Sequence, residues 1–304
     1  MKKILCVFCV LALTVSVCFA ADKAKPEVVN AGVLTWLGTT EEEFQAGLDD
    51  LRKAVSPLVP TTDDPDWFGE DMLEGFILDL VKTRRRIKFY DSLMTMQMAL
   101  RSAMVDEIIL PEAVGMYLVR NNPKYDIYFS LNMMPSTIAF GFRAGNVELQ
   151  KEFNSAIAAM KKDGTLAKLE RQFITELAGE PEVVKFTEFK GAQTIRAAVT
   201  GDLPPIDFIA ADGRPAGYNT AILAEIGRRL KKNVRLISVD SGGRSAALAS
   251  ERADVVFWYR NTEGIKTPKK VKVRGGVIRD TNEGVILSSP YYEWDVDLVI
   301  GIAK

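Results

Sequence analysis

The distribution of apolar and polar residues along the chain predicts an α/β protein in which strands and helices alternate. Short apolar runs bounded by turn residues are typical of buried strands, whereas apolar residues three or four positions apart are typical of helices that face a core. In residues 147–162, for example, the apolar residues share one helical face, and Gly164 ends the helix. Alternating elements of this length favour βαβ units and largely parallel sheets. Strands are expected at residues 31–37, 87–90, 107–110, 138–142, 194–199, 234–239, 254–258, 284–294 and 298–302, and helices at 39–51, 72–82, 93–104, 113–119, 147–162, 219–230 and 244–250.

Two strand–helix–strand units have similar sequences. Asp-Ser, then Ala-Leu, then an aspartate before an apolar run follow one another in residues 91–109 and again in residues 240–257. An ancient duplication and the common pattern of βαβ units both explain this similarity. In either case the chain is long enough for a full core, most simply as two lobes.

Residues 1–20 have the features of a secretory signal peptide. Two lysines precede an apolar run that ends at Val17, and small residues stand before a polar segment. The run is too short for a stable membrane span, so we expect cleavage after Ala20 and export of the mature protein. The alternative, a lipid anchor at Cys18, is less favoured because Val17 is larger than the residue that normally precedes such a cysteine.

Composition then excludes several classes of function. The chain has no histidine, and its three cysteines all lie in the leader, so the mature protein would lack disulfides, thiol nucleophiles, Cys/His zinc sites and histidine bases. The 39 basic residues, less two in the leader, leave 37 against 40 acidic residues, a net charge of −3. No basic stripe is present. We therefore expect no cofactor, no metal and no nucleic-acid partner.

Two sets of short motifs occur in the chain. The later set is Pro204-Pro205, Asp212-Gly213, Gly217-Tyr218-Asn219, Ala253-Asp254-Val255-Val256 and Ser289-Pro290-Tyr291-Tyr292, and the earlier set is Phe89-Tyr90-Asp91-Ser92, Val105-Asp106 and Lys162-Asp163-Gly164-Thr165-Leu166. With these motifs the chain resembles one known family, the periplasmic amino-acid-binding proteins of ABC importers (family 3 extracellular solute-binding proteins). Residues 194–258 and 284–302 resemble the first lobe of these proteins, and residues 87–176 resemble their second lobe and closing helices.

This resemblance implies a two-lobed α/β fold of the periplasmic-binding-protein type (type II), with the lobe order reversed as in a circular permutation. It implies that two lobes close on a ligand in the cleft and that the ligand passes to a membrane permease. The expected organisation is a signal peptide at 1–20, a lobe resembling the family's second lobe at 27–143, closing helices that pack on the other lobe at 144–177, a linker at 178–193, and a lobe resembling the family's first lobe at 194–304.

The chain departs from the family pattern at three positions. Leu203 stands where the family usually has an aromatic residue over the ligand, and Asn219 stands where it usually has an aspartate. The family's carboxylate-binding arginine has no aligned counterpart, although Arg260 is close in sequence. These departures put an α-amino acid in doubt as the ligand.

Candidate binding residues follow from the strands without reference to any family. In open α/β sheets, ligands bind beyond the carboxyl ends of the strands, where loops converge and helix N-termini offer unpaired N–H groups. This rule selects Gly38, Thr39, Thr40, Asp91, Glu112, Asp202, Phe208, Arg244, Trp258, Tyr259 and Arg260.

Their chemistry suits a small polar ligand. Thr39 and Thr40, with Arg244 or Arg260 opposite, would hold a carboxylate or phosphate. Asp91, Glu112 or Asp202 would hold an ammonium, and Phe208, Trp258 and Tyr259 would stack on the remainder. Structural roles are the alternatives: Thr39, Thr40 and Asp91 as helix caps, Trp258 as packing between lobes, and Tyr291, Tyr292 and Trp294 as core or hinge residues.

The leading hypothesis is therefore a periplasmic protein that captures a small polar metabolite, an amino acid or a related compound, and delivers it to an ABC permease. A ligand sensor or interaction module on the same fold is the alternative. An enzyme of the dehydratase or murein-cleaving type is less favoured, because no motif places a pair of carboxylates for acid–base chemistry.

Overall fold

The computed structural model describes residues 27–34, 83–210, 212–239, 243–261 and 284–303. These residues form an α/β fold, as predicted, with a nine-stranded mixed sheet and a three-stranded sheet. The strands of the large sheet are β1 (Glu27–Leu34), β2 (Thr83–Tyr90), β3 (Glu107–Pro111), β4 (Tyr125–Arg143), β5 (Thr194–Val199), β9 (Asn233–Ser238), β10 (Val255–Asn261), β11 (Val285–Leu287) and β12 (Tyr292–Ile302).

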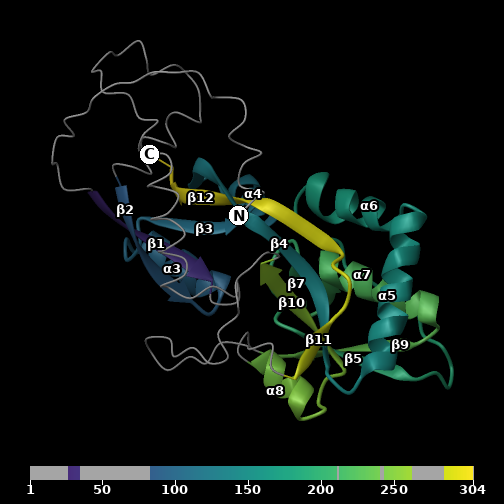
Figure 1. Cartoon of the computed structure of the whole chain (residues 1–304). Coiled ribbons are helices and arrows are strands. Elements are labelled where there is room, and N and C mark those ends of the chain that lie inside the picture. Colours follow the sequence, from purple (N-terminus) through teal and green to yellow (C-terminus); the bar gives the residue numbers. More distant parts are fainter. Residues whose placement is uncertain (1–26, 35–82, 211, 240–242, 262–283, 304) are drawn as a thin grey trace, which may run out of the picture.

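The large sheet contains the same strand arrangement twice. The order β2-β1-β3-β12-β4 forms one end, which we call lobe A, and the order β9-β5-β10-β4-β11 forms the other, lobe B (Figure 1). In each lobe three parallel strands are followed by two antiparallel ones. The fourth strand of each lobe is contributed by a chain segment that crosses from the other lobe.

The long strands β4 and β12 join the lobes. β4 begins beside β12, with Tyr125 opposite Ile302, and ends beside β10 and β11. The register places Pro111, at the end of β3, opposite Asp297, and Asn261, at the end of β10, opposite Ser136. The carboxyl ends of the parallel strands in both lobes therefore point toward the junction.

The helices cover the sheet and begin or end close to the predicted positions. They are α3 (Leu93–Arg101), α4 (Glu112–Asn121), α5 (Val147–Lys162), α6 (Thr165–Glu170) with the π-helical turn η5 (Arg171–Thr175), α7 (Tyr218–Leu230) and α8 (Arg244–Ala249). The positive φ of Gly164, 79°, ends α5 as expected, because a residue with a side chain is strained there. Within the described residues, no helix is long and apolar enough to cross a membrane.

A cluster of aromatic rings fills the core of lobe B beneath α5. Phe140 of β4 packs 5.0 Å from Phe153 and 4.6 Å from Tyr291, measured between ring centroids. Phe142 meets Phe153 edge to face at 5.0 Å. Edge-to-face and offset contacts of this kind are favoured because the ring edge is positive and the face negative.

Charged side chains form hydrogen bonds and ion pairs that connect helices α5 and α6 to α7. Arg229 donates hydrogen bonds to Asp163 Oδ2 (2.8 Å) and Thr165 Oγ1 (3.0 Å), and Lys232 forms an ion pair with Glu152. The Lys162–Leu166 motif is thus the point at which the chain turns against lobe B.

The three-stranded sheet follows β5 and was not predicted. It consists of β6 (Asp202–Leu203), β7 (Asp207–Ile209) and β8 (Pro215–Ala216). Val183 forms a bridge with Ala216, which attaches the predicted linker to this sheet.

One structural expectation is wrong, and three predicted strands have different bounds. Ser92 caps α3, because its Oγ accepts a hydrogen bond from Thr95 N, so the expected capping role of Asp91 is not realised. The strand predicted at 138–142 is the last part of β4, which is 19 residues long. The two last strands are β11 and β12, and β12 alone spans Tyr292–Ile302. The helices expected at 39–51 and 72–82 lie outside the described residues.

Candidate functional site

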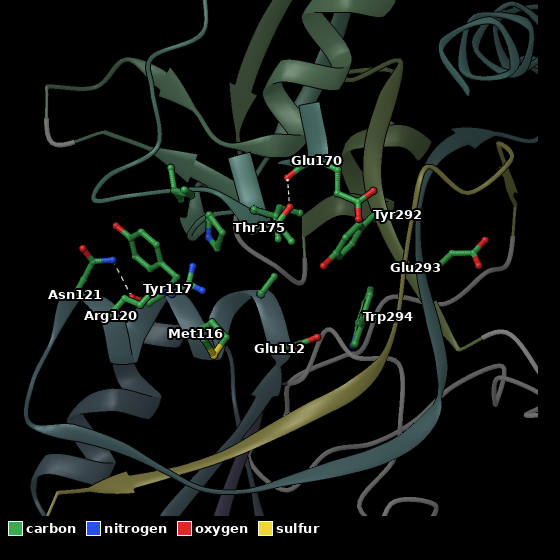
Figure 2. A pocket seen from close by; sticks show the side chains of 14 residues that line it. Glu112, Met116, Tyr117, Arg120, Asn121, Glu170, Thr175, Tyr292, Glu293 and Trp294 are labelled. Carbon is green, nitrogen blue, oxygen red and sulfur yellow. Dashed lines mark hydrogen bonds between the residues drawn. The ribbon is translucent and has the colours of Figure 1, made fainter. Parts of the chain in front are cut away.

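A cavity of about 250 Å³ lies at the junction of the two lobes. One wall is the exposed face of α4 in lobe A, and the opposite wall is formed by α6 and η5 in lobe B (Figure 2). Pro205, beyond β5, and the start of β12 close it at the sheet. Its volume is slightly below the ~300–1,000 Å³ that is usual for ligand pockets, so it suits a small molecule.

Helix α4 presents one face to this cavity. Glu112, Met116, Tyr117 and Arg120 line it, and their spacing of four, five and eight residues places them on the same side of a helix. The opposite face of α4 is buried through Val114 and Leu118. Because α4 starts directly after β3, the sheet fixes the position of Glu112 at the junction.

Two aromatic side chains of β12 form the inner end of the cavity. Tyr292 and Trp294 are each 8% exposed, and their rings stack with centroids 5.9 Å apart. The Trp294 indole donates its N–H to Asp297 Oδ1 at 3.1 Å, which holds the ring in place. The Tyr292 hydroxyl points into the cavity in Figure 2 and has no hydrogen-bond partner in the described part of the chain.

The charged side chains around Tyr292 are mainly acidic. Glu112 and Glu170 lie on either side of its hydroxyl in Figure 2, one from each wall. Burial raises the pKa of the Tyr292 hydroxyl, and the negative charges of Glu170 and Glu112 raise it further. The phenol is therefore protonated at neutral pH and able to donate or accept a hydrogen bond.

Two buried carboxyl groups lie near the site but do not line it. Burial raises the pKa of Asp297 to about 6, against the effect of the Trp294 hydrogen bond. Burial likewise raises the pKa of Asp207 to about 6, although Thr200 donates to it from its backbone N–H (3.0 Å) and its hydroxyl (2.9 Å). Both carboxyl groups have structural partners, so we assign them to the scaffold.

Residues 195–263 match the family model of bacterial extracellular solute-binding proteins, family 3. The match covers β5 to β10, which contain four of the five first-lobe motifs, and the resemblance is confirmed for these residues. The motif at 289–292 and the second-lobe motifs lie outside the matched residues. No curated protein matches the chain.

The chain is also similar to several solved structures. These include the zinc-bound ligand-binding component of an ABC-type import system from Staphylococcus aureus (11% identity, 91% of this chain, 66% of that one, TM-score 0.38), so this chain spans just under two thirds of that protein. They also include the reduced OxyR regulatory domain from Pseudomonas aeruginosa (9% identity, 91% of this chain, 90% of that one, TM-score 0.37). A third is the alkanesulfonate-binding protein SsuA from Xanthomonas axonopodis pv. citri bound to MOPS (8% identity, 92% of this chain, 66% of that one, TM-score 0.39). All three TM-scores are below 0.5, and no assignment rests on these similarities.

Of the candidate binding residues predicted from the sequence, Glu112 lines the cavity. Asp91 lies at the exposed end of β2, apart from the residues that line it. Gly38, Thr39 and Thr40 lie outside the described residues.

Asp202, Phe208 and Arg244 lie together beyond the end of β5 but do not line the cavity. Asp202 pairs with Phe208 in the small sheet, and burial raises the pKa of Asp202 although the Arg244 guanidinium opposes the shift. Arg244 is buried, and its Nη1 donates to the backbone oxygen of Phe257 at 3.3 Å.

Trp258, Tyr259 and Arg260 occupy the end of β10 that faces the junction, as the strand-end rule predicts. Their backbones pair with Ala139, Ile138 and Thr137 of β4. Their side chains are outside the description, so their role stays a prediction.

Sequence reasoning missed Tyr117, Arg120 and Glu170 as lining residues, because none of them follows a strand. A signal was available in α4, where polar and large residues recur on the face opposite the apolar one. Core or hinge positions were the structural alternative for Tyr292 and Trp294; both are buried, and both also border the cavity. No group of three or more His, Cys, Asp or Glu residues suited to a metal ion occurs in the described part of the chain.

Proposed function

We propose that this protein is an exported solute-binding protein that captures a small polar metabolite between its two lobes and delivers it to an ABC importer. The observation that carries the proposal is the cavity at the junction, which is lined by α4 from lobe A and by α6 and η5 from lobe B. The family match at 195–263 supports the same function. We place the mature protein in the periplasm, after removal of residues 1–20.

We further propose that the lobes follow the reversed order inferred from the sequence. Lobe B contains the matched residues 195–263, yet it follows lobe A in the chain. The closing helices 144–177 come directly after β4 and contact α7 of lobe B. This arrangement is the one expected if the family's second lobe and closing helices preceded its first lobe.

Binding would proceed by lobe closure about the two crossing strands. A ligand that contacts α4 and α6 at once interacts with both lobes only when they are close together. It therefore favours the closed state by its differential affinity for that state. The crossing strands β4 and β12 connect the two lobes and would bend as the lobes close.

A thermal-shift screen of amino acids, small peptides and organic acids tests this function. A ligand at a hundredfold excess over its dissociation constant stabilises the folded state by about 2.7 kcal/mol. We expect at least one class to raise the melting temperature of the wild-type protein. Thr175→Trp, at an exposed position of the cavity wall, should remove that shift by filling the space.

The control is Glu188→Gln, an exposed residue away from the cavity, which should respond to the ligand as the wild type does. A ligand that stabilises Thr175→Trp as strongly as wild type would place binding elsewhere and refute the cavity as the site. Loss of solute uptake on deletion of the gene, together with neighbouring permease and ATPase genes, would test delivery to an importer.

A further inference from the structure

We infer that the inner end of the cavity receives a flat apolar ring of a metabolite whose polar groups stay at the rim, and that Asp297 is a positioning residue for this subsite. The inference rests on the proposed function, because it assigns a ligand class to the same cavity. It depends on three observations: the lining loses its charge with depth, two stacked rings form the inner end, and a buried hydrogen bond holds one of these rings.

The first observation concerns the depth at which charge is found in the lining. The buried lining residues carry no charge: they are Ala113, Pro205, Tyr292 and Trp294. The charged lining residues are exposed, or in one case half-buried: they are Glu112, Arg120 and Glu293, with Glu170 half-buried. Because a charged ligand group is costly to remove from water, the inner part favours an apolar group and the rim a polar one.

The second observation is that the inner end is flat. The rings of Tyr292 and Trp294 stack with an interplanar angle of 24°, and both lie on the same side of the cavity in Figure 2. Behind them the fully buried Tyr218 meets Tyr292 edge to face at 5.5 Å. Half-buried Met116 of α4 and Ile174 of η5 supply apolar contacts from the other walls. A flat ring gains more contact with such a surface than a puckered ring of the same size, and aromatic rings also gain from offset stacking.

The third observation is the contact that fixes the orientation of Trp294. Its indole N–H donates to Asp297 Oδ1 at 3.1 Å, and Asp297 is itself buried and does not line the cavity. If the indole turned away, a buried N–H would lose its partner, which is unfavourable. Asp297 therefore acts on the subsite through Trp294, by keeping the face of the indole in one orientation.

The test uses two neutral probes that differ in the ring alone, benzyl alcohol and cyclohexylmethanol. Burial of apolar area by itself would favour cyclohexylmethanol, whose saturated ring carries more apolar surface. Magnetic resonance titration of ¹⁵N-labelled protein follows the indole N–H signal of Trp294, identified by its absence from Trp294→Phe. We expect benzyl alcohol to shift this signal and to bind about fivefold more tightly than cyclohexylmethanol.

Variants of Asp297 test the positioning role. Asp297→Leu removes the acceptor, so it should move the Trp294 indole signal in the free protein, weaken benzyl alcohol binding by about fivefold and abolish the preference for the flat ring. Asp297→Asn keeps an acceptor oxygen and should bind within about twofold of wild type, and the distant Glu188→Gln should not differ from it. If Asp297→Leu does not fold, Asp297→Thr takes its place, because the hydroxyl of threonine reaches less far than the carboxyl.

Failure of this inference can be distinguished from failure of the proposed function. Equal or tighter binding of cyclohexylmethanol would overturn the inference, and so would a Trp294 signal that benzyl alcohol leaves unchanged. A folded variant that lacks the acceptor but keeps the wild-type preference would refute the role of Asp297. If the ring preference is absent while a metabolite stabilises the wild type but not Thr175→Trp, the proposed function stands without the ring. If benzyl alcohol binds beside Trp294 but no metabolite stabilises the wild type, the proposed function fails and the subsite stands.

Discussion

Asp297, a residue near the junction, makes the stability of the folded state depend on pH. It is buried on β12 beside Trp294, and its pKa is raised to about 6 by burial. The folded state therefore binds a proton more tightly than the unfolded state. The contribution of Asp297 to stability is fully present below pH 4, the ordinary range of the group, and is lost as pH rises through 6.

Replacing Asp297 by Asn should expose this dependence. The difference in free energy of unfolding between Asp297→Asn and wild type should grow in favour of the variant by about 2.4 kcal/mol from pH 4 to pH 7.5, since one pKa unit corresponds to 1.36 kcal/mol and the unfolded carboxyl is already half ionised at pH 4. Any effect of the amide on stability that does not depend on pH cancels in this comparison. The titration of Asp207 cancels too, because it is the same in both proteins. Urea denaturation at several pH values would measure it.

Asp163→Asn provides the matched control. Hydrogen bonds from Thr165 and Arg229 lower the pKa of Asp163 to about 2, so it stays ionised throughout the range from pH 4 to 7.5. Its effect on stability should be nearly constant above about pH 5 and should decline as pH falls from there through about 2. A constant difference for Asp297→Asn as well would show that burial does not perturb this carboxyl.

At the scale of single residues, sequence reasoning succeeded where chain position alone decides the role. Glu112 directly follows a strand and does line the cavity, as the strand-end rule predicts. The preference for certain residue types at helix N-termini could not decide between Asp91 and Ser92 as the cap of α3, because a carboxylate and a hydroxyl are about equally good caps. On α3, Met96 is buried whereas Met94 and Met98 are exposed, so residue type alone does not decide which methionine joins the core.

Among the elements, helices and short parallel strands were predicted to within a few residues, and the crossing strands were not. An amphipathic helix such as α5 carries its whole pattern in its own sequence. In contrast, β4 changes partners along its length, from β12 to β10 and β11, so its surroundings change and no single alternation of apolar residues runs through it. The lining of the cavity by η5 likewise depends on how α6 packs, which local sequence does not encode.

The attachment of α5 and α6 to α7 depends most on Arg229. Its guanidinium bonds Asp163 and Thr165 across the interface and Glu225 on its own helix, and its side chain is 18% exposed. Arg229→Gln should lower the free energy of unfolding by roughly 1–2 kcal/mol, because several charge-assisted bonds are lost together.

The neighbouring Arg228 is the control for this variant. Within the described part of the chain its side chain bonds Glu225, on the same helix, and it is 56% exposed. Arg228→Gln should change stability by no more than about 0.5 kcal/mol, as exposed pairs usually do. Equal effects of the two substitutions in chemical denaturation would mean that the contact between α6 and α7 contributes little.

At the scale of the whole molecule, the repeated strand order makes the position of the chain ends unimportant to the cavity. Glu27 begins β1, and Ile302 ends β12 in the same lobe. Gly32 is level with Ile108 of β3, which is level with Ile300 of β12. Two strand spacings and three residues therefore separate Glu27 from Ile302, about 14 Å by standard strand geometry.

A permuted chain tests this view and the proposed lobe order together. It would begin at Glu180, run to Ile302, continue through a linker of about eight Gly and Ser residues, which spans roughly 15 Å, and then run from Glu27 to Ala178. The new opening lies beside the exposed Gly179 and preserves the bridge between Val183 and Ala216. Because all lining residues of the cavity except Leu177 and Pro205 lie in helices and strands that the permutation keeps intact, we expect this chain to fold and to bind the same ligand within about threefold of wild-type affinity. Circular dichroism measures the folding of the permuted chain, and calorimetry measures its affinity for the ligand.

A permuted chain that folds but no longer binds would show that the natural connection between η5 and β5 shapes the cavity. In that case the reversed order of the lobes would be a requirement of the site and not an interchangeable arrangement of two repeated halves.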